Sequence, residues 1–275
     1  MKAVIESNRT THKKNVPSWI TIKPNDSLTM RYRVAMANRG LGLTDNNRKI
    51  GSLKDKHKGE IGFLIGNGPS VRIEDLERLQ DKVTFCCNRF YLAYDRMKFR
   101  STYLVSTDKQ MIRDFGAEMV AMHPGEVFFV SDESPNILGD FIWFRSISRT
   151  PIEFSENVYH FVMPGGGTLI TAIQIGHHMG ITKFVLYGVD HSFKFETNEN
   201  AKDIWESARG EGNHFIQNYR CGKPWAPPVL WQAEGAFLSC HVFLQARGGW
   251  LKNATRGGKL EVLERIDFDH IASRP

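Results

Sequence analysis

Short apolar runs alternate along this chain with stretches whose apolar residues recur at helical spacing. The run 61–65 ends at a glycine, and the apolar residues Ile73, Leu76 and Leu79 then recur with helical spacing. This order predicts a strand, a loop and a helix. The same patterns predict further strands over 83–87, 103–105, 127–130, 183–187 and 250–253, and further helices over 108–119, 168–179 and 231–247. The alternation indicates an α/β fold with a Rossmann-like, doubly wound and mostly parallel sheet.

Two segments depart from this alternation. Residues 1–52 are polar and irregular, with Pro17 and Pro24 as breakers, and we expect them to form an N-terminal extension. Residues 53–275 are expected to form one nucleotide-binding domain. Within it, the segment 193–228 is polar, aromatic and rich in glycine and proline, and its length predicts a lid or binding loop.

The composition is that of an ordinary globular protein, with 275 residues, 41% hydrophobic and 24% charged. No apolar run approaches the ~20 residues that span a bilayer, and the first residues lack the pattern of a signal peptide. We therefore expect a cytoplasmic protein, and a location at the inner face of the membrane stays open.

The net charge of +6 is spread thinly, without the dense basic stripe of a nucleic-acid-binding protein. This thinly spread positive charge leaves open a weak contact with a membrane surface. The sequence is also compatible with a homo-oligomer. Lys54, Lys56 and Lys58 cluster with His57 before the first strong strand, which suggests a nearby anionic ligand.

The four cysteines do not show zinc-ligand spacing. They lie at Cys86, Cys87, Cys221 and Cys240. The adjacent pair falls inside an apolar strand, so these two are predicted to be buried thiols, and a disulfide framework is not expected.

The loop after the first strand is the first candidate binding element. Its residues are Gly66, Asn67, Gly68, Pro69 and Ser70. Two glycines allow a tight turn and a close approach of the backbone to a ligand, and the helix that follows favours a phosphate. A purely geometric turn between strand and helix explains the same residues about equally well.

Further polar residues follow other predicted strands or open predicted helices. Asn88 and Asp190 each end a strand, where ligands of open α/β sheets bind, although either could simply cap a turn or loop. Asp108 has the same placement but is also a good helix N-cap, which we slightly favour. The triplet from Gly165 through Gly166 and Gly167 to Thr168 opens a helix and offers unpaired N–H groups to an anion.

His214 is the histidine best placed for chemistry, because it lies in the polar lid, where a neutral imidazole can act as a general base. His177 and His178 fall inside a predicted helix and are expected to be structural. The sequence contains neither a Ser-His-Asp order nor a His-Glu-x-x-His or Asp-x-Asp motif, so a metal-independent mechanism without a cofactor fits best.

Several of these residues together resemble a known family. The segments 54–59, 66–70, 87–91 and 253–261 look like the bacterial MptE-like family, named for its likeness to 6-hydroxymethylpterin diphosphokinases, and the resemblance covers about residue 50 to the C-terminus. The glycine loop, the Cys-Asn strand end and Gly188-Val189-Asp190 are also similar to Campylobacter-type sialyltransferases, with a GT-A-like variant of the fold, and to flagellin-modifying Maf proteins.

The resemblance implies a nucleotide pocket and a lid histidine. In these sialyltransferases CMP lies along the glycine loop and the asparagine strand end, and a lid histidine deprotonates the acceptor without a metal. His214 matches that histidine, and Tyr219 is the nearest match to a tyrosine at the leaving phosphate.

Three functions are compatible with these residues. The leading hypothesis is a glycosyltransferase that moves a sialic-acid-like nonulosonic acid from a CMP-sugar donor to the hydroxyl of a glycan acceptor, in surface polysaccharide biosynthesis. The first alternative is an ATP- and Mg²⁺-dependent pyrophosphokinase that acts on a hydroxymethylpterin-like acceptor. The second alternative is a noncatalytic nucleotide-sugar-binding protein.

Overall fold

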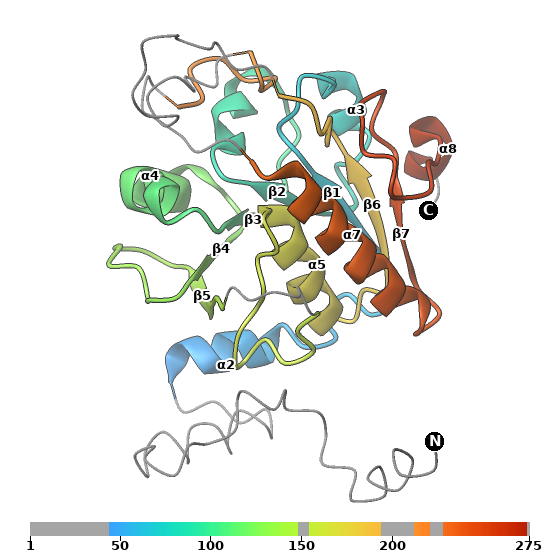
Figure 1. Ribbon diagram of the computed structural model, residues 1–275. Coiled ribbons are helices and arrows are strands. Elements are labelled where there is room, and N and C mark those ends of the chain that lie inside the picture. The colour runs from blue at the N-terminus through green and yellow to red at the C-terminus, as the bar shows by residue number, and fades with distance from the viewer. Residues whose placement is uncertain (1–43, 148–153, 194–211, 221–227, 274–275) are drawn as a thin grey trace, which may run out of the picture.

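The computed structural model describes residues 44–147, 154–193, 212–220 and 228–273, which form a seven-stranded sheet (Figure 1). Every pair of neighbouring strands is parallel, and their order is β5-β4-β3-β2-β1-β6-β7. The strands are β1 (Ile61–Ile65), β2 (Val83–Cys87), β3 (Tyr103–Ser106), β4 (Glu126–Ser131), β5 (Ile142–Arg145), β6 (Lys183–Tyr187) and β7 (Trp250–Asn253). The predicted α/β, Rossmann-like fold is confirmed.

Helices cover both faces of the sheet. They are α2 (Asp45–Ser52), α3 (Ile73–Glu77), the 3₁₀ helix η1 (Phe90–Arg96), α4 (Lys109–Met122), α5 (Thr168–His178), α7 (Leu230–Gln245) and α8 (Phe268–Ala272). The core residues of α2, α5 and α7 pack with one face, whereas those of α3, η1, α4 and α8 pack with the other. In Figure 1, α5 and α7 lie side by side in front of the sheet.

Alternation along each strand divides the core between these faces. Leu64 packs with the α5 and α7 cluster, and its neighbours Phe63 and Ile65 pack with the opposite cluster. Because both faces are covered, the central strands are mostly apolar instead of alternating between apolar and polar residues. This is why β1, β2 and β6 were predictable as continuous apolar runs.

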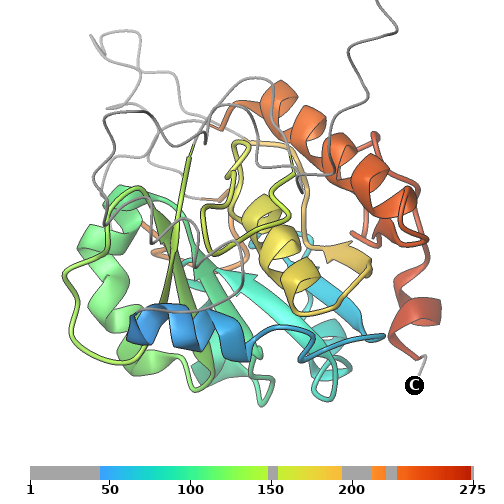
Figure 2. The ribbon, with the colours of Figure 1, turned by 90° about the horizontal axis from the view of Figure 1, so that it is seen from below.

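The helix α2 joins part of the expected extension to the folded body, as the view from below shows (Figure 2). The Asn46 side chain donates to the Trp143 carbonyl at 2.7 Å and accepts from the Trp143 N–H at 2.8 Å, while Ile50 is buried in the core. These contacts close the outer edge of β5. Residues 1–43, the main part of the expected extension, lie outside the described residues, as do 194–211 and 221–227 of the expected lid.

Several side chains take structural places that the sequence predicted. Cys86 and Cys87 are buried free thiols, as is Cys240, and Cys221 lies outside the described residues. His177 lies edge-on to Phe154, and a His178 ring nitrogen bonds the Ile50 carbonyl at 2.9 Å. Within the described ranges, no helix combines the length and apolar character that a membrane span requires.

The chain changes direction in the sheet between β1 and β6. It runs outward from β1 to β5, and then returns to place β6 and β7 on the other side of β1. In open α/β sheets the crevice at such a switch point, outside the carboxyl ends of the strands, is where ligands bind. The arrowhead of β6 points to the top of Figure 1, where the segment 212–220 also lies.

Candidate functional site

A cavity of about 560 Å³ opens at this switch point. Its wall contains the ends of β1, β2, β3 and β6, the first turns of α5 and α7, and the segment 213–220. All the predicted site residues line it except Pro69 and Ser70: the lining includes Gly66, Asn67, Gly68, Asn88, Asp108, Gly166, Gly167, Thr168, Asp190, His214 and Tyr219. Residues predicted from separate motifs are therefore gathered around one space.

The two glycines of the first loop are required by the neighbouring strand end. A Cβ on Gly66 would lie 2.3 Å from the Gly188 carbonyl oxygen, and a Cβ on Gly68 would lie 1.9 Å from an Asp190 carboxylate oxygen. The Gly68 N–H donates to the Gly188 carbonyl at 3.0 Å. The loop is thus packed onto the end of β6, and the missing side chains also leave its backbone exposed to the cavity.

Asp190 holds this loop in place. Its Oδ2 accepts from the Ser70 hydroxyl at 2.8 Å and from the Ser70 N–H at 3.3 Å, and its carbonyl accepts from the Lys259 N–H at 2.8 Å. The Thr255 hydroxyl accepts from the Val189 N–H at 3.0 Å. The C-terminal run 253–261 therefore buttresses the end of β6 and, with it, the cavity wall.

Asn67 is a buried amide at the base of the cavity. Its Nδ2 donates to the Cys87 carbonyl at 3.0 Å and to the Tyr219 hydroxyl at 2.9 Å. Its Oδ1 is buried and accepts no hydrogen bond from the described residues. A buried acceptor of this kind is costly unless a donor reaches it, so a ligand that carries an amino or hydroxyl group would satisfy it.

Asn88 and Asp108 have clear local roles. Asn88 has a left-handed backbone with φ of 54°, and its Oδ1 accepts from the Ser106 hydroxyl at 2.8 Å. Asp108 is the N-cap of α4, and its Oδ1 accepts from the N–H groups of Gln110 and Met111 at 2.8 and 3.0 Å. The cap role that we favoured for Asp108 is confirmed, while its Oδ2 lies 3.8 Å from an Arg220 nitrogen on the cavity wall.

The N-terminus of α5 faces the cavity through the glycine triplet. Gly165 and Gly166 have positive φ angles of 54° and 83°, and Gly167 is an N-cap without a side chain to bond the free N–H groups. The Thr168 hydroxyl bonds the Thr107 hydroxyl at 3.0 Å. A helix start carries roughly half a positive charge, so this wall favours an anion.

His214 and Tyr219 lie together on the segment 213–220, which forms one wall of the cavity and is called the closing segment below. Their rings stack at 3.8 Å between centroids and 12° between planes, and the Phe215 N–H donates to the Asn67 carbonyl at 3.0 Å. Tyr219 is buried, and burial raises the pKa of its hydroxyl well above the usual range despite hydrogen bonds with Asn67 and Asn88. At neutral pH that hydroxyl is therefore a hydrogen-bonding group and not a base.

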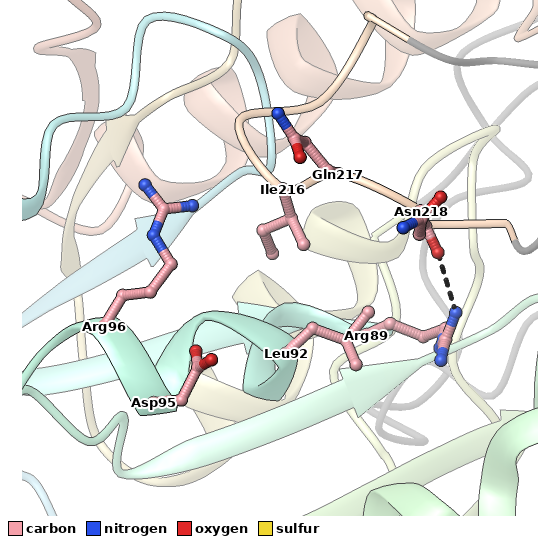
Figure 3. A pocket seen from close by; sticks show the side chains of 7 residues that line it. All are labelled: Arg89, Leu92, Asp95, Arg96, Ile216, Gln217 and Asn218. Atoms are coloured by element: carbon pink, nitrogen blue, oxygen red, sulfur yellow. Dashed lines mark hydrogen bonds between the residues drawn. The ribbon is translucent and has the colours of Figure 1, made fainter.

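Arg89 anchors this segment to the sheet. Its guanidinium donates to the carbonyls of Tyr219 at 2.7 Å and Asn218 at 3.3 Å, and pairs with Glu118 of α4 at 3.2 Å. Figure 3 shows the bond to Asn218 beside a smaller hollow of about 440 Å³ between η1 and this segment. Arg89 therefore fixes the position of the chain that carries His214.

The sequence did not single out two other features of the wall. His191 follows Asp190 directly, and a ring nitrogen of His191 lies 2.9 Å from a carboxylate oxygen of Glu234 on α7. Arg220 is almost completely buried and brings a guanidinium to the cavity. The strand-end rule could have found His191, but no sequence signal joins it to a glutamate 43 residues away.

The lysine cluster before β1 is not near the cavity, so that expectation is wrong. Lys56 pairs with Glu126 at 3.0 Å, and ring nitrogens of His57 bond Tyr103 and Glu60. These residues precede β1, whereas the glycine loop follows it. The length of the strand separates them, because a five-residue strand spans roughly 16 Å.

The described part of the chain contains no group of three or more histidine, cysteine, aspartate or glutamate residues arranged to hold a metal ion. The polar groups on the cavity wall are instead backbone N–H groups, amides, hydroxyls, two imidazoles and the guanidinium of Arg220, together with two aspartates. Both aspartates are already engaged, Asp108 as a helix cap and Asp190 with Ser70.

No protein-family model matches the sequence, and no curated protein matches it. Among solved structures, the chain is similar to a Maf glycosyltransferase from Magnetospirillum magneticum AMB-1, with 15% sequence identity and a TM-score of 0.48. The match covers 89% of this chain and 43% of that protein, so the chain spans less than half of its length. The function is therefore argued below from the cavity and the sequence motifs.

Proposed function

We propose that this chain is a metal-independent glycosyltransferase that moves a sialic-acid-like nonulosonic acid from a CMP donor to a glycan hydroxyl. The observation that carries the proposal is the cavity at the β1/β6 switch point, where glycine loops, a helix N-terminus and a histidine share one wall. Cytidine as the base and a nonulosonic acid as the sugar follow from the resemblance of the sequence motifs.

The anionic part of the donor is assigned to the side of the cavity with hydrogen-bond donors. The N-terminus of α5, from Gly166 to Thr168, faces the cavity without a side-chain cap, and the backbone of Gly66 to Gly68 lies across the switch point. Arg220 adds a positive charge on the same cavity wall. A CMP-nonulosonate carries a phosphate and a carboxylate, and both are stabilised by such groups.

The nucleoside is assigned to the amide side of the cavity. The Asn67 Oδ1 needs a donor, which the amino group of cytosine or a ribose hydroxyl supplies. Asn88 and Asp190 line the same space and would orient the base, the ribose or the sugar.

His214 is assigned as the general base. Stacking on Tyr219 fixes the plane of its imidazole, and the contact of Phe215 with Asn67 fixes the backbone beside it. In transfer, the acceptor oxygen forms a bond to the sugar as its proton passes to His214, and the bond from the sugar to the phosphate breaks to release CMP. Tyr219 contributes by holding the imidazole.

A ligand screen and one substitution test this function. CMP, without metal, should raise the melting temperature, because saturation at 100 times the dissociation constant stabilises by roughly 2.7 kcal/mol. His214→Ala should lower release of CMP from CMP-N-acetylneuraminic acid by about 100-fold or more while CMP still binds. His241→Ala, a change of a histidine on α7 that bonds the Leu251 carbonyl outside the cavity, is the matched control.

Three outcomes would contradict the proposal. Stabilisation by ATP with Mg²⁺ but not by CMP would favour the pyrophosphokinase. CMP binding without any turnover of the CMP-sugar, with or without glycan acceptors, would favour a noncatalytic binding protein. Unchanged turnover in His214→Ala would exclude His214 as the base.

A further inference from the structure

A histidine on the cavity wall, His191, is paired with a carboxylate of the helix α7. A ring nitrogen of His191, taken as Nε2, lies 2.9 Å from Oε1 of Glu234, and the His191 side chain is only 6% exposed. His191 belongs to the loop after β6, and Glu234 belongs to α7, so the pair joins the sheet to the helix that covers it. A carboxylate behind an imidazole fixes the orientation and tautomer of the ring and stabilises its protonated form.

The backbone of His191 is held in an unfavourable conformation. Its φ is 52°, in the left-handed region that costs a residue with a side chain about 1 kcal/mol or more. Val189 and Asp190, which precede it, are fixed by Thr255 and Lys259. Such strain persists only where the surroundings enforce it, and it aims this imidazole at the cavity.

The second ring nitrogen of His191 is available for a ligand. With Nε2 bound to Glu234, Nδ1 makes no hydrogen bond with any described residue, and His191 lines the cavity. The N-terminus of α5 and the loop of Gly66 to Gly68, to which we assign the donor phosphate, line the same cavity. The imidazole thus has one nitrogen fixed by a carboxylate and the other free to exchange a proton.

We propose that His191, held by Glu234, donates a proton to the departing phosphate of the nucleotide. This inference rests on the proposed glycosyltransfer. As the bond between the sugar and the phosphate oxygen breaks, the electron pair stays on that oxygen, and the Nδ1 proton of the His191 imidazolium passes to it. His214 takes the acceptor proton at the other end of the transfer. CMP leaves with the added proton, and both imidazoles return to their starting states by exchange with water.

The charges around His191 make this role testable by pH. Glu234 faces it from α7, Asp190 adjoins it in its own loop with Oδ2 bound to Ser70, and Arg220 and His214 line the same cavity from the closing segment. A general acid acts only in its protonated form, so turnover should fall on the alkaline side of the pH profile, and this fall should depend on the residue at position 191.

The test uses His191→Asn and Glu234→Gln in the full chain. Asparagine tolerates the left-handed backbone, so His191→Asn removes the proton donor without adding strain. We expect turnover of CMP-N-acetylneuraminic acid to fall by about 100-fold or more, the alkaline limb to disappear, and the dissociation constant of CMP to change by less than roughly threefold. Glu234→Gln keeps the shape but removes the charge that stabilises the imidazolium, and the alkaline limb should move to lower pH. His241→Asn on α7 should leave the profile unchanged.

The outcomes separate this inference from the proposed function. If the unmodified chain consumes the CMP-sugar and His191→Asn retains its rate and its alkaline limb, the proton-donor role is wrong and the glycosyltransferase stands. An unshifted limb in Glu234→Gln would also overturn the pairing. If the unmodified chain neither binds CMP nor consumes the CMP-sugar, the proposed function fails and this inference fails with it.

Discussion

Gly66→Ala tests whether the glycine loop is shaped by its contact with the end of β6. A Cβ at this position would lie 2.3 Å from the Gly188 carbonyl oxygen and 2.9 Å from its carbonyl carbon. Ordinary Cβ contacts begin near 3.4 Å. Because both obstructing atoms belong to the backbone, no side chain can rotate away, and the two loops must separate by about 1 Å.

The cost of that separation can be worked from the bonds that it breaks. The Gly66 N–H donates to the Tyr187 carbonyl at 2.8 Å, and the Gly68 N–H donates to the Gly188 carbonyl at 3.0 Å. Each bond contributes about 1 kcal/mol to stability, and overpacking adds about 1–3 kcal/mol of strain. We expect the free energy of unfolding to fall by about 3–5 kcal/mol, which corresponds to a melting temperature lower by roughly 6–20 °C.

The assay is urea unfolding followed by circular dichroism, with CMP binding measured in parallel. Gly235→Ala is the control, because Gly235 lies exposed in α7 and a Cβ there meets nothing within 4 Å. It should stabilise the protein by up to about 1 kcal/mol, since alanine has the higher helix propensity. A Gly66→Ala protein within about 0.5 kcal/mol of the parent would refute the proposed contact between the loops.

Three further predictions concern the rest of the fold. Burial lowers the pKa of His123 to about 4 from 6.5, so below pH 6.5 the unfolded chain takes up a proton that the folded chain does not. The contribution of His123 to the free energy of unfolding is therefore complete above pH 6.5 and is lost as the pH falls towards 4. Urea unfolding should show a loss of about 2 kcal/mol from this residue between pH 7.5 and 5, and this loss should be absent in His123→Phe. Burial would raise the pKa of Asp75, but the Arg256 and Tyr187 hydrogen bonds outweigh it and lower the pKa; Asp75→Asn should therefore cost about 2–4 kcal/mol of unfolding free energy at pH 7 and leave the circular dichroism spectrum unchanged. Arg89→Lys removes the paired bonds to the closing segment, and hydrogen exchange should accelerate in residues 212–220 but not in β1.

Each of these three predictions has a result that would contradict it. If the stability of His123→Phe falls with acid as much as that of the parent, other histidines cause the loss, because burial also lowers the pKa of His160, His177 and His178. An unchanged stability of Asp75→Asn would show that the Arg256 pair contributes little. Equal exchange in Arg89→Lys would mean that another contact holds the segment.

The sequence predicted most of the sheet because its central strands are buried on both faces. β1, β2, β6 and β7 were expected at the bounds that the structure shows. The sequence missed β5, a four-residue edge strand in which Trp143 is half-buried and Arg145 is exposed, so no continuous apolar run marks it. The short helices α2, η1 and α8 escaped for a related reason, because a few residues give too little periodicity to recognise.

The sequence predicted those residues of the site that follow a strand or begin a helix. Loops that follow parallel strands converge at one edge, and this places Gly66, Asn88 and Asp190 around one cavity. Sequence alone could not tell that the Asp190 carboxylate binds Ser70, or that Asp108 faces Arg220. The sequence also suggested, wrongly, that the lysine cluster lies beside the ligand. The cluster and the glycine loop are close along the chain, but the whole length of β1 separates them in space.

The sequence by itself thus determined the α/β class, the order of the main elements and the loops that meet at the switch point. These follow from the continuous apolar runs of the buried strands and from the helical periodicity of the stretches between them. The tertiary structure decided which side chains meet across elements: His214 on Tyr219, Arg89 on the closing segment and His191 on Glu234. Such pairs arise from packing between segments far apart in the chain, and no local pattern in a single sequence encodes their distance or orientation.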